Sequence, residues 1–119
     1  VPMNVEELTQ LVVSALEDIK AQNLLTLDVR NQTDIADVMV VATGQSARQV
    51  KALAANVVEA AKHQGMMPLG VEGEDEGDWV LVDLADVIVH VMLEETRALY
   101  DLESLWSLSP TSVGDETVS

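Results

Sequence analysis

Residues 72–92 read EGEDEGDWVLVDLADVIVHVM, and this stretch contains the clearest structural signals of the 119-residue chain. Five of its first seven residues are carboxylates and the other two are glycines, a composition that predicts a solvated loop. Two apolar runs follow, at about 79–83 and 87–92, with only a few residues between them. We therefore expect a β-hairpin, with the acidic loop attached to the edge of a rigid sheet. A loop in that position can present an acidic surface to a basic partner.

The first part of the chain predicts a helix followed by a strand. Asn4 and Glu7 have the spacing of a reciprocal helix N-cap, and Gln22-Asn23 is the expected stop. The apolar residues at helical spacing are Val5, Leu8, Val12, Ala15, Leu16 and Ile19. Residues 24–29 then predict a strand, because apolar and polar positions alternate. Its residues expected on one face are Leu25, Leu27 and Val29.

A second strand and helix are expected after a polar turn. Residues 38–43 are apolar almost throughout, which predicts a central strand covered on both faces. Ser46 and Gln49 again have the spacing of a reciprocal N-cap, and Gly65 is placed to end the helix. The stripe of that helix consists of Val50, Leu53, Ala54, Val57, Val58 and Ala61. A short strand within 66–71 and a short helix over 94–102 complete the expected elements.

This order of elements predicts an α/β fold, a single domain with a mixed β-sheet flanked by helices. The domain is expected to span residues 1–107. Residues 108–119 are rich in Ser, Thr and acidic residues with one Pro and one Gly, which predicts a disordered tail.

Charge and composition exclude several functions. The net charge is −15, from 21 acidic and six basic residues, and such a field repels phosphate backbones. Direct nucleic-acid binding is therefore not expected, and the acidity either maintains solubility or selects a basic protein partner. The chain has no cysteine, no apolar run long enough for a membrane helix, and no visible signal or transit segment. These features lead us to expect a cytoplasmic, bacterial protein.

Two features suggest chemistry, and both have a simpler interpretation. Gly44-x-Ser46 lies between a strand and a helix N-terminus, where nucleotidyltransferase-fold enzymes hold a phosphate. Such enzymes also need paired carboxylates on a strand to hold magnesium, and none is present, so the turn is better explained as a helix cap. The acidic loop lacks the ligand spacing of an EF-hand, so no metal or other cofactor is expected.

The remaining candidates are one histidine and the few aromatic residues. His90 lies mid-strand among apolar neighbours, which indicates a structural role more than a catalytic one. The aromatic residues are Trp79, Tyr100 and Trp106. Trp79 is the best contact anchor, because it follows the acidic loop; Trp106 could equally anchor a contact or dock the last helix.

Several segments, in order, resemble the ribosomal silencing factor family, also called Iojap-like proteins. The matching segments are 27–30, 34–37, 42–50, 72–73 with 77–83, 86–92 and 97–106. They run LDVR, DIAD, ATGQSARQV, EG with GDWVLVD, DVIVHVM and RALYDLESLW. Val38 departs from the family pattern, in which an aromatic residue follows the aspartate.

The resemblance implies a nucleotidyltransferase-like fold without catalytic metal ligands, and a protein that is not an enzyme. It implies a translational repressor that binds the large ribosomal subunit through its fourteenth protein. The bound factor would block joining of the small subunit under nutrient limitation, and it would be a homodimer when free. On this basis we expect a partner-binding surface formed by Glu72, Glu74, Asp75, Asp78, Trp79, His90, Tyr100, Asp101 and Glu103.

Two other functions remain open at this level. One is a nucleotide-binding or nucleotidyltransferase-like enzyme that uses the Gly44-x-Ser46 turn. The other is an acidic dimeric scaffold with a different basic partner. Neither requires a membrane or sequence-specific contact with nucleic acid.

Overall fold

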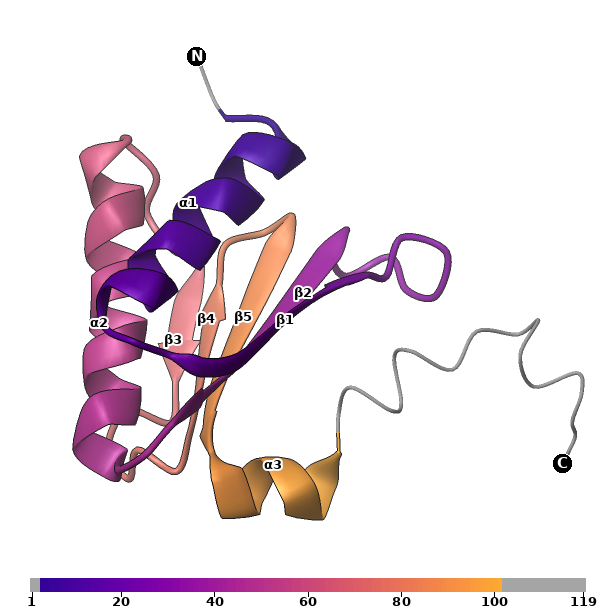
Figure 1. Cartoon of the computed structure of the whole chain (residues 1–119). Helices are drawn as coiled ribbons and strands as arrows, with labels where there is room; N and C mark the ends of the chain where they lie inside the picture. The colour runs from indigo at the N-terminus through magenta and orange to yellow at the C-terminus, as the bar shows by residue number, and fades with distance from the viewer. Residues whose placement is uncertain (1–2, 102–119) are drawn as a thin grey trace, which may run out of the picture.

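The computed structural model describes residues 3–101. Helices and strands follow one another in the order that the sequence predicts (Figure 1). The elements are α1 (Val5–Asp18), β1 (Gln22–Asp28), β2 (Val38–Gly44), α2 (Ala47–His63), β3 (Gly70–Glu72), β4 (Trp79–Asp83), β5 (Val87–Leu93) and α3 (Glu94–Tyr100). The expected tail at 108–119 lies outside the described residues.

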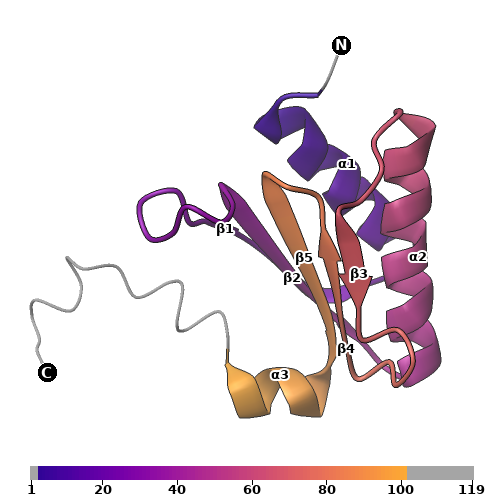
Figure 2. The ribbon, with the colours of Figure 1, turned by 180° about the vertical axis from the view of Figure 1, so that it is seen from behind.

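The strands form one mixed sheet in the order β1-β2-β5-β4-β3. β2 and β5 are parallel, whereas the other neighbouring pairs are antiparallel. α1 and α2 lie together against one face, and α3 lies at one end of the sheet (Figures 1 and 2). The predicted fold class, a single α/β domain with a mixed sheet flanked by helices, is therefore confirmed.

The main core lies between the two long helices and the sheet. Both predicted helical stripes face it, and the sheet supplies mostly valines. The strand residues in this core include Val40, Ala42, Val80, Val82, Val89 and Val91. Every residue of β2 is buried, which confirms the prediction of a central strand covered on both faces. Removal of this apolar surface from water is the main force that holds the helices on the sheet.

Side-chain N-caps explain where α1 and α2 begin, and the cap of α2 differs from the prediction. Asn4 Oδ1 accepts from the Glu7 N–H at 2.8 Å, and Glu7 Oε1 accepts from the Asn4 N–H at 3.1 Å. Ser46 Oγ likewise accepts from the Gln49 N–H, but Gln49 Oε1 bonds the N–H of Gln45 instead of Ser46. The Gln49 side chain also donates to the Ile19 carbonyl. It therefore ties the start of α2 to the end of α1.

Several predicted boundaries were wrong. α1 ends at Asp18, before the predicted stop, because Lys20 turns into the left-handed region with φ of 64°. Gln22-Asn23 consequently begins β1. β3 covers only 70–72, and α3 ends at Tyr100, where Asp101 adopts φ of 51°. The predicted end of α2 was right, since Gly65 follows its C-cap with φ of 79°.

The predicted hairpin is present and places the acidic loop. β4 and β5 pair antiparallel, and their turn is closed by a bond from the Leu84 N–H to the Val87 carbonyl. The Asp83 carboxylate accepts from the Ala85 N–H at 2.9 Å and supports the same turn. The acidic loop joins β3 to β4 at the other end of the hairpin. It therefore lies at the same end of the sheet as α3.

Candidate partner-binding surface

The acidic loop is a structured turn. Gly73 and Gly77 both have positive φ, and the Gly77 N–H donates to the Gly73 carbonyl at 3.1 Å. The Lys51 ammonium of α2 donates to the Asp75 carbonyl at 3.1 Å. The Asp78 carbonyl accepts from the Leu93 N–H at the end of β5. These bonds fix the loop main chain to α2 and to β5, and its carboxylates remain in solvent.

Trp79, His90 and Tyr100 form a cluster on the far face of the sheet, which is the face turned away from α1 and α2. Trp79 Nε1 donates to His90 Nδ1 at 2.9 Å. The rings of Trp79 and Tyr100 lie 4.9 Å apart between centroids, at an interplanar angle of 49°. Tyr100 is 56% exposed, whereas His90 is only 6% exposed. The buried histidine therefore holds the indole through its hydrogen bond, and the tyrosine forms the solvent-exposed part of the cluster.

Burial determines the charge of His90. Removal of the ring from water lowers the pKa of His90 from 6.5 to about 4. Its Nδ1 accepts the indole hydrogen bond, so that nitrogen carries no proton. The predicted structural role of this histidine is consistent with both observations.

A small cavity lies beside the cluster and joins it to the acidic loop. Its volume is about 270 Å³, and its walls are Glu72, Gly73, Asp78, Trp79, Leu81 and Tyr100. It combines an aromatic wall with two carboxylates. Such a cavity can receive an apolar or long basic side chain of a partner protein.

The structure brings together five of the nine predicted site residues. Glu72, Asp78, Trp79 and Tyr100 line the cavity, and His90 supports Trp79. Glu74 is in the same loop but lines a different cavity, against α2.

The other predicted residues lie outside this group. Asp75 is at the exposed tip of the loop, and Asp101 caps α3. Glu103 lies outside the described residues.

Sequence reasoning missed Leu81 and Leu99. Leu81 shares the far face with Trp79 because residues two apart on a strand point the same way, so the alternation in β4 could have revealed it. Leu99 is 77% exposed next to Tyr100 in α3. An amphipathic helix of seven residues gives too weak a pattern to show which leucine faces solvent.

The Gly44-x-Ser46 turn, which was the alternative nucleotide-binding site, has a structural explanation. A Cβ on Gly44 would lie 2.8 Å from the Val50 side chain, so glycine is needed for packing of α2 on the sheet. Ser46 Oγ is used as the helix N-cap. Within residues 3–101, no three His, Asp or Glu side chains are grouped so that they could hold a metal ion.

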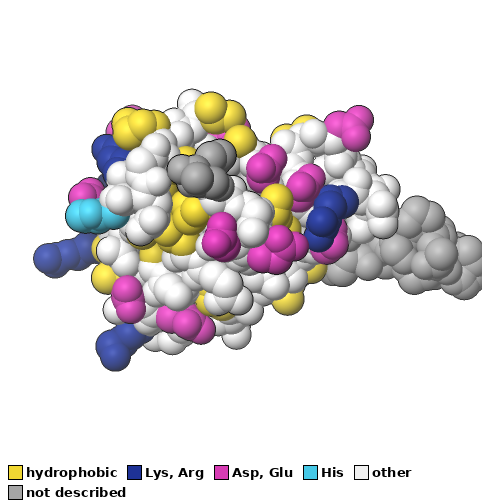
Figure 3. All heavy atoms as spheres, turned by 90° about the horizontal axis from the view of Figure 1, so that it is seen from above, with side chains coloured by type: hydrophobic (Ala, Val, Ile, Leu, Met, Phe, Trp, Pro, Cys, Tyr) yellow, Lys and Arg dark blue, Asp and Glu magenta, His cyan; other side chains and the backbone are white. Residues whose placement is uncertain are grey.

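Negative charge extends beyond the acidic loop. Acidic side chains are spread over the end of the molecule that is seen from above in Figure 3, which is opposite α3. This agrees with the net charge of −15. No helix in the described part of the chain is long and apolar enough to cross a membrane.

Comparison with known proteins places the chain in one family. The family model described as ribosomal silencing factor during starvation matches residues 2–118. Ribosomal silencing factor RsfS of Chromobacterium violaceum is 48% identical over 104 residues, which cover 87% of this chain and 85% of that protein. The chain therefore belongs to the ribosomal silencing factor family, whose members are regulatory proteins of translation.

A solved structure and a more distant relative agree with this assignment. A crystal structure of a Chromobacterium violaceum protein is 44% identical with a TM-score of 0.86, and the match covers 98% of this chain and 92% of that one. The mouse protein named mitochondrial assembly of ribosomal large subunit protein 1 is 33% identical over 101 residues. That match covers 82% of this chain and 44% of the mouse protein.

The loop geometry gives a matched pair of glycine variants. A Cβ on Gly73 would lie 2.0 Å from the Trp79 carbonyl oxygen, at a positive φ, so Gly73→Ala should lower the free energy of unfolding by more than about 1 kcal/mol. Gly70 has open space around it, so Gly70→Ala should stay within about 0.5 kcal/mol of the parent. Urea unfolding followed by circular dichroism measures both. Equal stabilities of the two variants would contradict the described loop conformation.

The buried histidine predicts a pH dependence of stability. Between pH 6.5 and about 4 the unfolded chain protonates His90 but the native state does not, so native stability falls as the pH is lowered through this range. The contribution is about 3 kcal/mol over the full range. The carboxylates titrate alike in the parent and in His90→Gln. As the pH is lowered from 6.5 to about 4, the parent should therefore lose about 3 kcal/mol more stability than the variant. The measurement is the free energy of unfolding of each protein at several pH values. An equal loss in the two proteins would show that His90 is not buried as described.

Proposed function

We propose that this protein represses translation by binding the large ribosomal subunit through the subunit's fourteenth protein. The bound factor then blocks joining of the small subunit when nutrients are scarce. Membership of the ribosomal silencing factor family supports a ribosomal target. The mouse relative is named for assembly of the ribosomal large subunit, which favours the large subunit as that target.

The observation that carries the proposal is the cavity where Trp79 and Tyr100 meet Glu72 and Asp78. Aromatic residues beside a cavity can supply most of the binding energy, because they bury a large area with little loss of entropy. The carboxylates around them complement a basic ribosomal protein. The same charges are repelled by bare ribosomal RNA, so contact through a protein is favoured over contact through RNA.

The residues of the proposed surface have different roles. Trp79 and Tyr100 are the anchors, and His90 holds the indole in place through its hydrogen bond. Glu72 and Asp78 contact the partner at the cavity. Around this centre we place Glu74, Asp75 and Asp101, whose charges steer the encounter. Glu103 belongs to the proposed surface from the sequence alone.

Obstruction follows from the size of the bound factor. The described part of the chain measures about 44 × 36 × 21 Å along its principal axes, enough to occupy a subunit interface. Silencing then needs no catalytic step, which fits a regulator that acts in the cytoplasm and is not an enzyme.

When free of the ribosome the protein is a homodimer, and the two copies separate on binding if one surface serves both contacts.

Removal of the indole tests the anchor. Trp79→Ala should raise the Kd for isolated large subunits by about 30-fold or more, which corresponds to about 2 kcal/mol. Met67→Ala is the control, because it removes a large apolar side chain, 66% exposed, that lies away from the cavity. Binding is measured by co-sedimentation with large subunits, after circular dichroism has shown that both variants are folded. Unchanged affinity of folded Trp79→Ala would remove Trp79 from the anchor role.

Paired charge variants test the steering. Glu72→Gln with Asp78→Asn should slow association with large subunits several-fold at low salt, and the difference from the parent should vanish at high salt. Glu17→Gln with Asp18→Asn removes the same charge at the end of α1 and should have a smaller effect. Stopped-flow fluorescence with labelled protein measures the rates. Equal slowing by both pairs would show that only net charge matters.

A further inference from the structure

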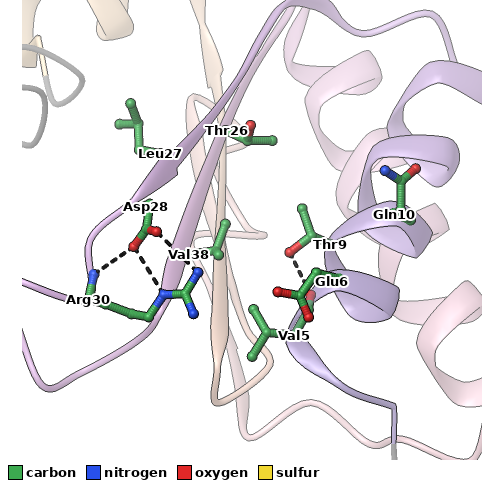
Figure 4. Close-up of a pocket in the computed structure, with 9 residues that line it drawn as sticks. All are labelled: Val5, Glu6, Thr9, Gln10, Thr26, Leu27, Asp28, Arg30 and Val38. Atoms are coloured by element: carbon green, nitrogen blue, oxygen red, sulfur yellow. Dashed lines mark hydrogen bonds and ion pairs between the residues drawn. The ribbon is translucent and has the colours of Figure 1, made fainter.

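One edge of the sheet, formed by β1, is not covered by the helices. β1 is an edge strand that pairs only with β2. Val40 of β2 is fully buried in the core with α1 and α2, but its partner in the register, Thr26 of β1, is exposed. A cavity of about 300 Å³ lies here, between β1 and the first turns of α1 (Figure 4). The molecule thus has a groove with a helix as one wall and a strand edge as the other.

The strand edge in this groove has main-chain groups available for pairing. The Val29 N–H donates toward β2, to the Asp37 carbonyl. Because these groups alternate in direction along an antiparallel strand, those of Leu25 and Leu27 also point toward β2. The N–H and C=O groups of Thr26 and Asp28 therefore point outward into the groove. Such an edge can accept one more strand.

The side chains of the groove have a net negative charge. Its ionisable residues are Glu6, Asp28 and Arg30. Arg30 donates from Nε and from a terminal nitrogen to the Asp28 carboxylate, at 3.2 and 3.1 Å, so these two charges satisfy each other (Figure 4). Glu6 is close enough to Arg30 to feel its charge but forms no ion pair with it, so one carboxylate of the groove can still pair with a positive charge on an incoming segment. Its other wall residues include Val5, Thr9 and Thr26, which suit branched and small side chains.

We propose that the groove between α1 and β1 binds an extended, basic segment of a partner protein, which adds to the sheet as a further strand beside β1. The main-chain groups of Thr26 and Asp28 pair with the segment, and Glu6 meets a Lys or Arg side chain. The site lies at the opposite edge of the sheet from β3 and the acidic loop, so it is independent of the proposed ribosome contact.

Charge argues against the two other polypeptides that could fill the groove. A second copy added at β1 would bring its own Glu6 and Asp28 close to the same carboxylates of the first copy. The chain's own residues 102–119 contain Glu103, Asp115 and Glu116 but no Lys or Arg. Neither supplies the positive charge that a basic segment would bring to the Glu6 carboxylate.

The test uses the full chain and a synthetic peptide as the probe. The peptide Lys-Val-Thr-Val-Lys-Val-Thr-Val-Lys should bind saturably, and amide hydrogen exchange at Thr26 and Asp28 should slow by about tenfold or more. Exchange at Leu25 and Leu27 should not change, because their N–H groups already point toward β2. The same peptide with Glu in place of each Lys should not bind. Absence of saturable binding of the basic peptide at millimolar concentration overturns the proposal.

Matched variants separate strand addition from other modes of binding. Thr26→Pro removes the outward N–H but no bond to β2, and should weaken peptide binding by about tenfold or more, whereas Thr26→Val keeps the N–H and should bind normally. Glu6→Gln should weaken binding, and Glu17→Gln on the same helix should not. Circular dichroism checks that each variant folds. Equal binding by the two Thr26 variants contradicts the proposal, and so does a parent dimer, seen by light scattering, that Thr26→Pro abolishes and Thr26→Val keeps.

A further variant keeps this inference distinct from the proposed function. Trp79→Ala should bind the peptide as the parent does, since the groove and the aromatic cluster share no residue. Conversely, Thr26→Pro should still bind large subunits. Loss of peptide binding in Trp79→Ala would show that the peptide occupies the aromatic cluster, and would overturn the groove as its site.

Discussion

Parallel pairing of β2 with β5 imposes a long connection, because the chain must leave one end of the sheet and re-enter at the other. Residues 45–86 make that connection and contain α2, β3 and β4. α2 returns across the face that α1 also covers, and β4 then runs antiparallel to β5. The start of β4 is thereby brought to the end of β5, where α3 begins. The acidic loop, Trp79 and Tyr100 meet at this end as a consequence of the topology.

The same pairing makes both faces of β2 and β5 buried, and the two faces are built differently. The helix side is filled by aliphatic residues, whereas the far side combines Met39, Val41 and Met92 with the Trp79–His90 pair. A polar group in that far layer is tolerated because the indole N–H and the imidazole nitrogen satisfy each other. The proposed anchor is consequently part of the packed structure and is held in one orientation. Such preorganisation lowers the entropy lost on binding.

Much of this architecture could be predicted, because long apolar periodicities and caps are strong signals. The stripes of both long helices, the buried second strand and the hairpin all follow from residue spacing. The misplaced ends of α1 and α3 have one physical origin. Lys20 and Asp101 both adopt positive φ, and neither position has the glycine that usually marks such a helix end. Similarly, sequence indicated Trp79 as an anchor but could not show that Glu74 faces α2, since this depends on tertiary packing.

The valine-rich sheet described above has a consequence for adaptability. Valine has a single favoured χ1 rotamer in most settings, so a core of Val80, Val82, Val89 and Val91 loses little side-chain entropy on folding and offers few alternative packings. The helix-facing layer of the sheet is therefore stiff. Adjustment to a partner is left to the unbranched side chains of the far face, where Trp79 packs in the cluster that contains Met39 and Met92. Natural variation among relatives is then expected to change specificity on the far face, with the helix-facing valines left as they are.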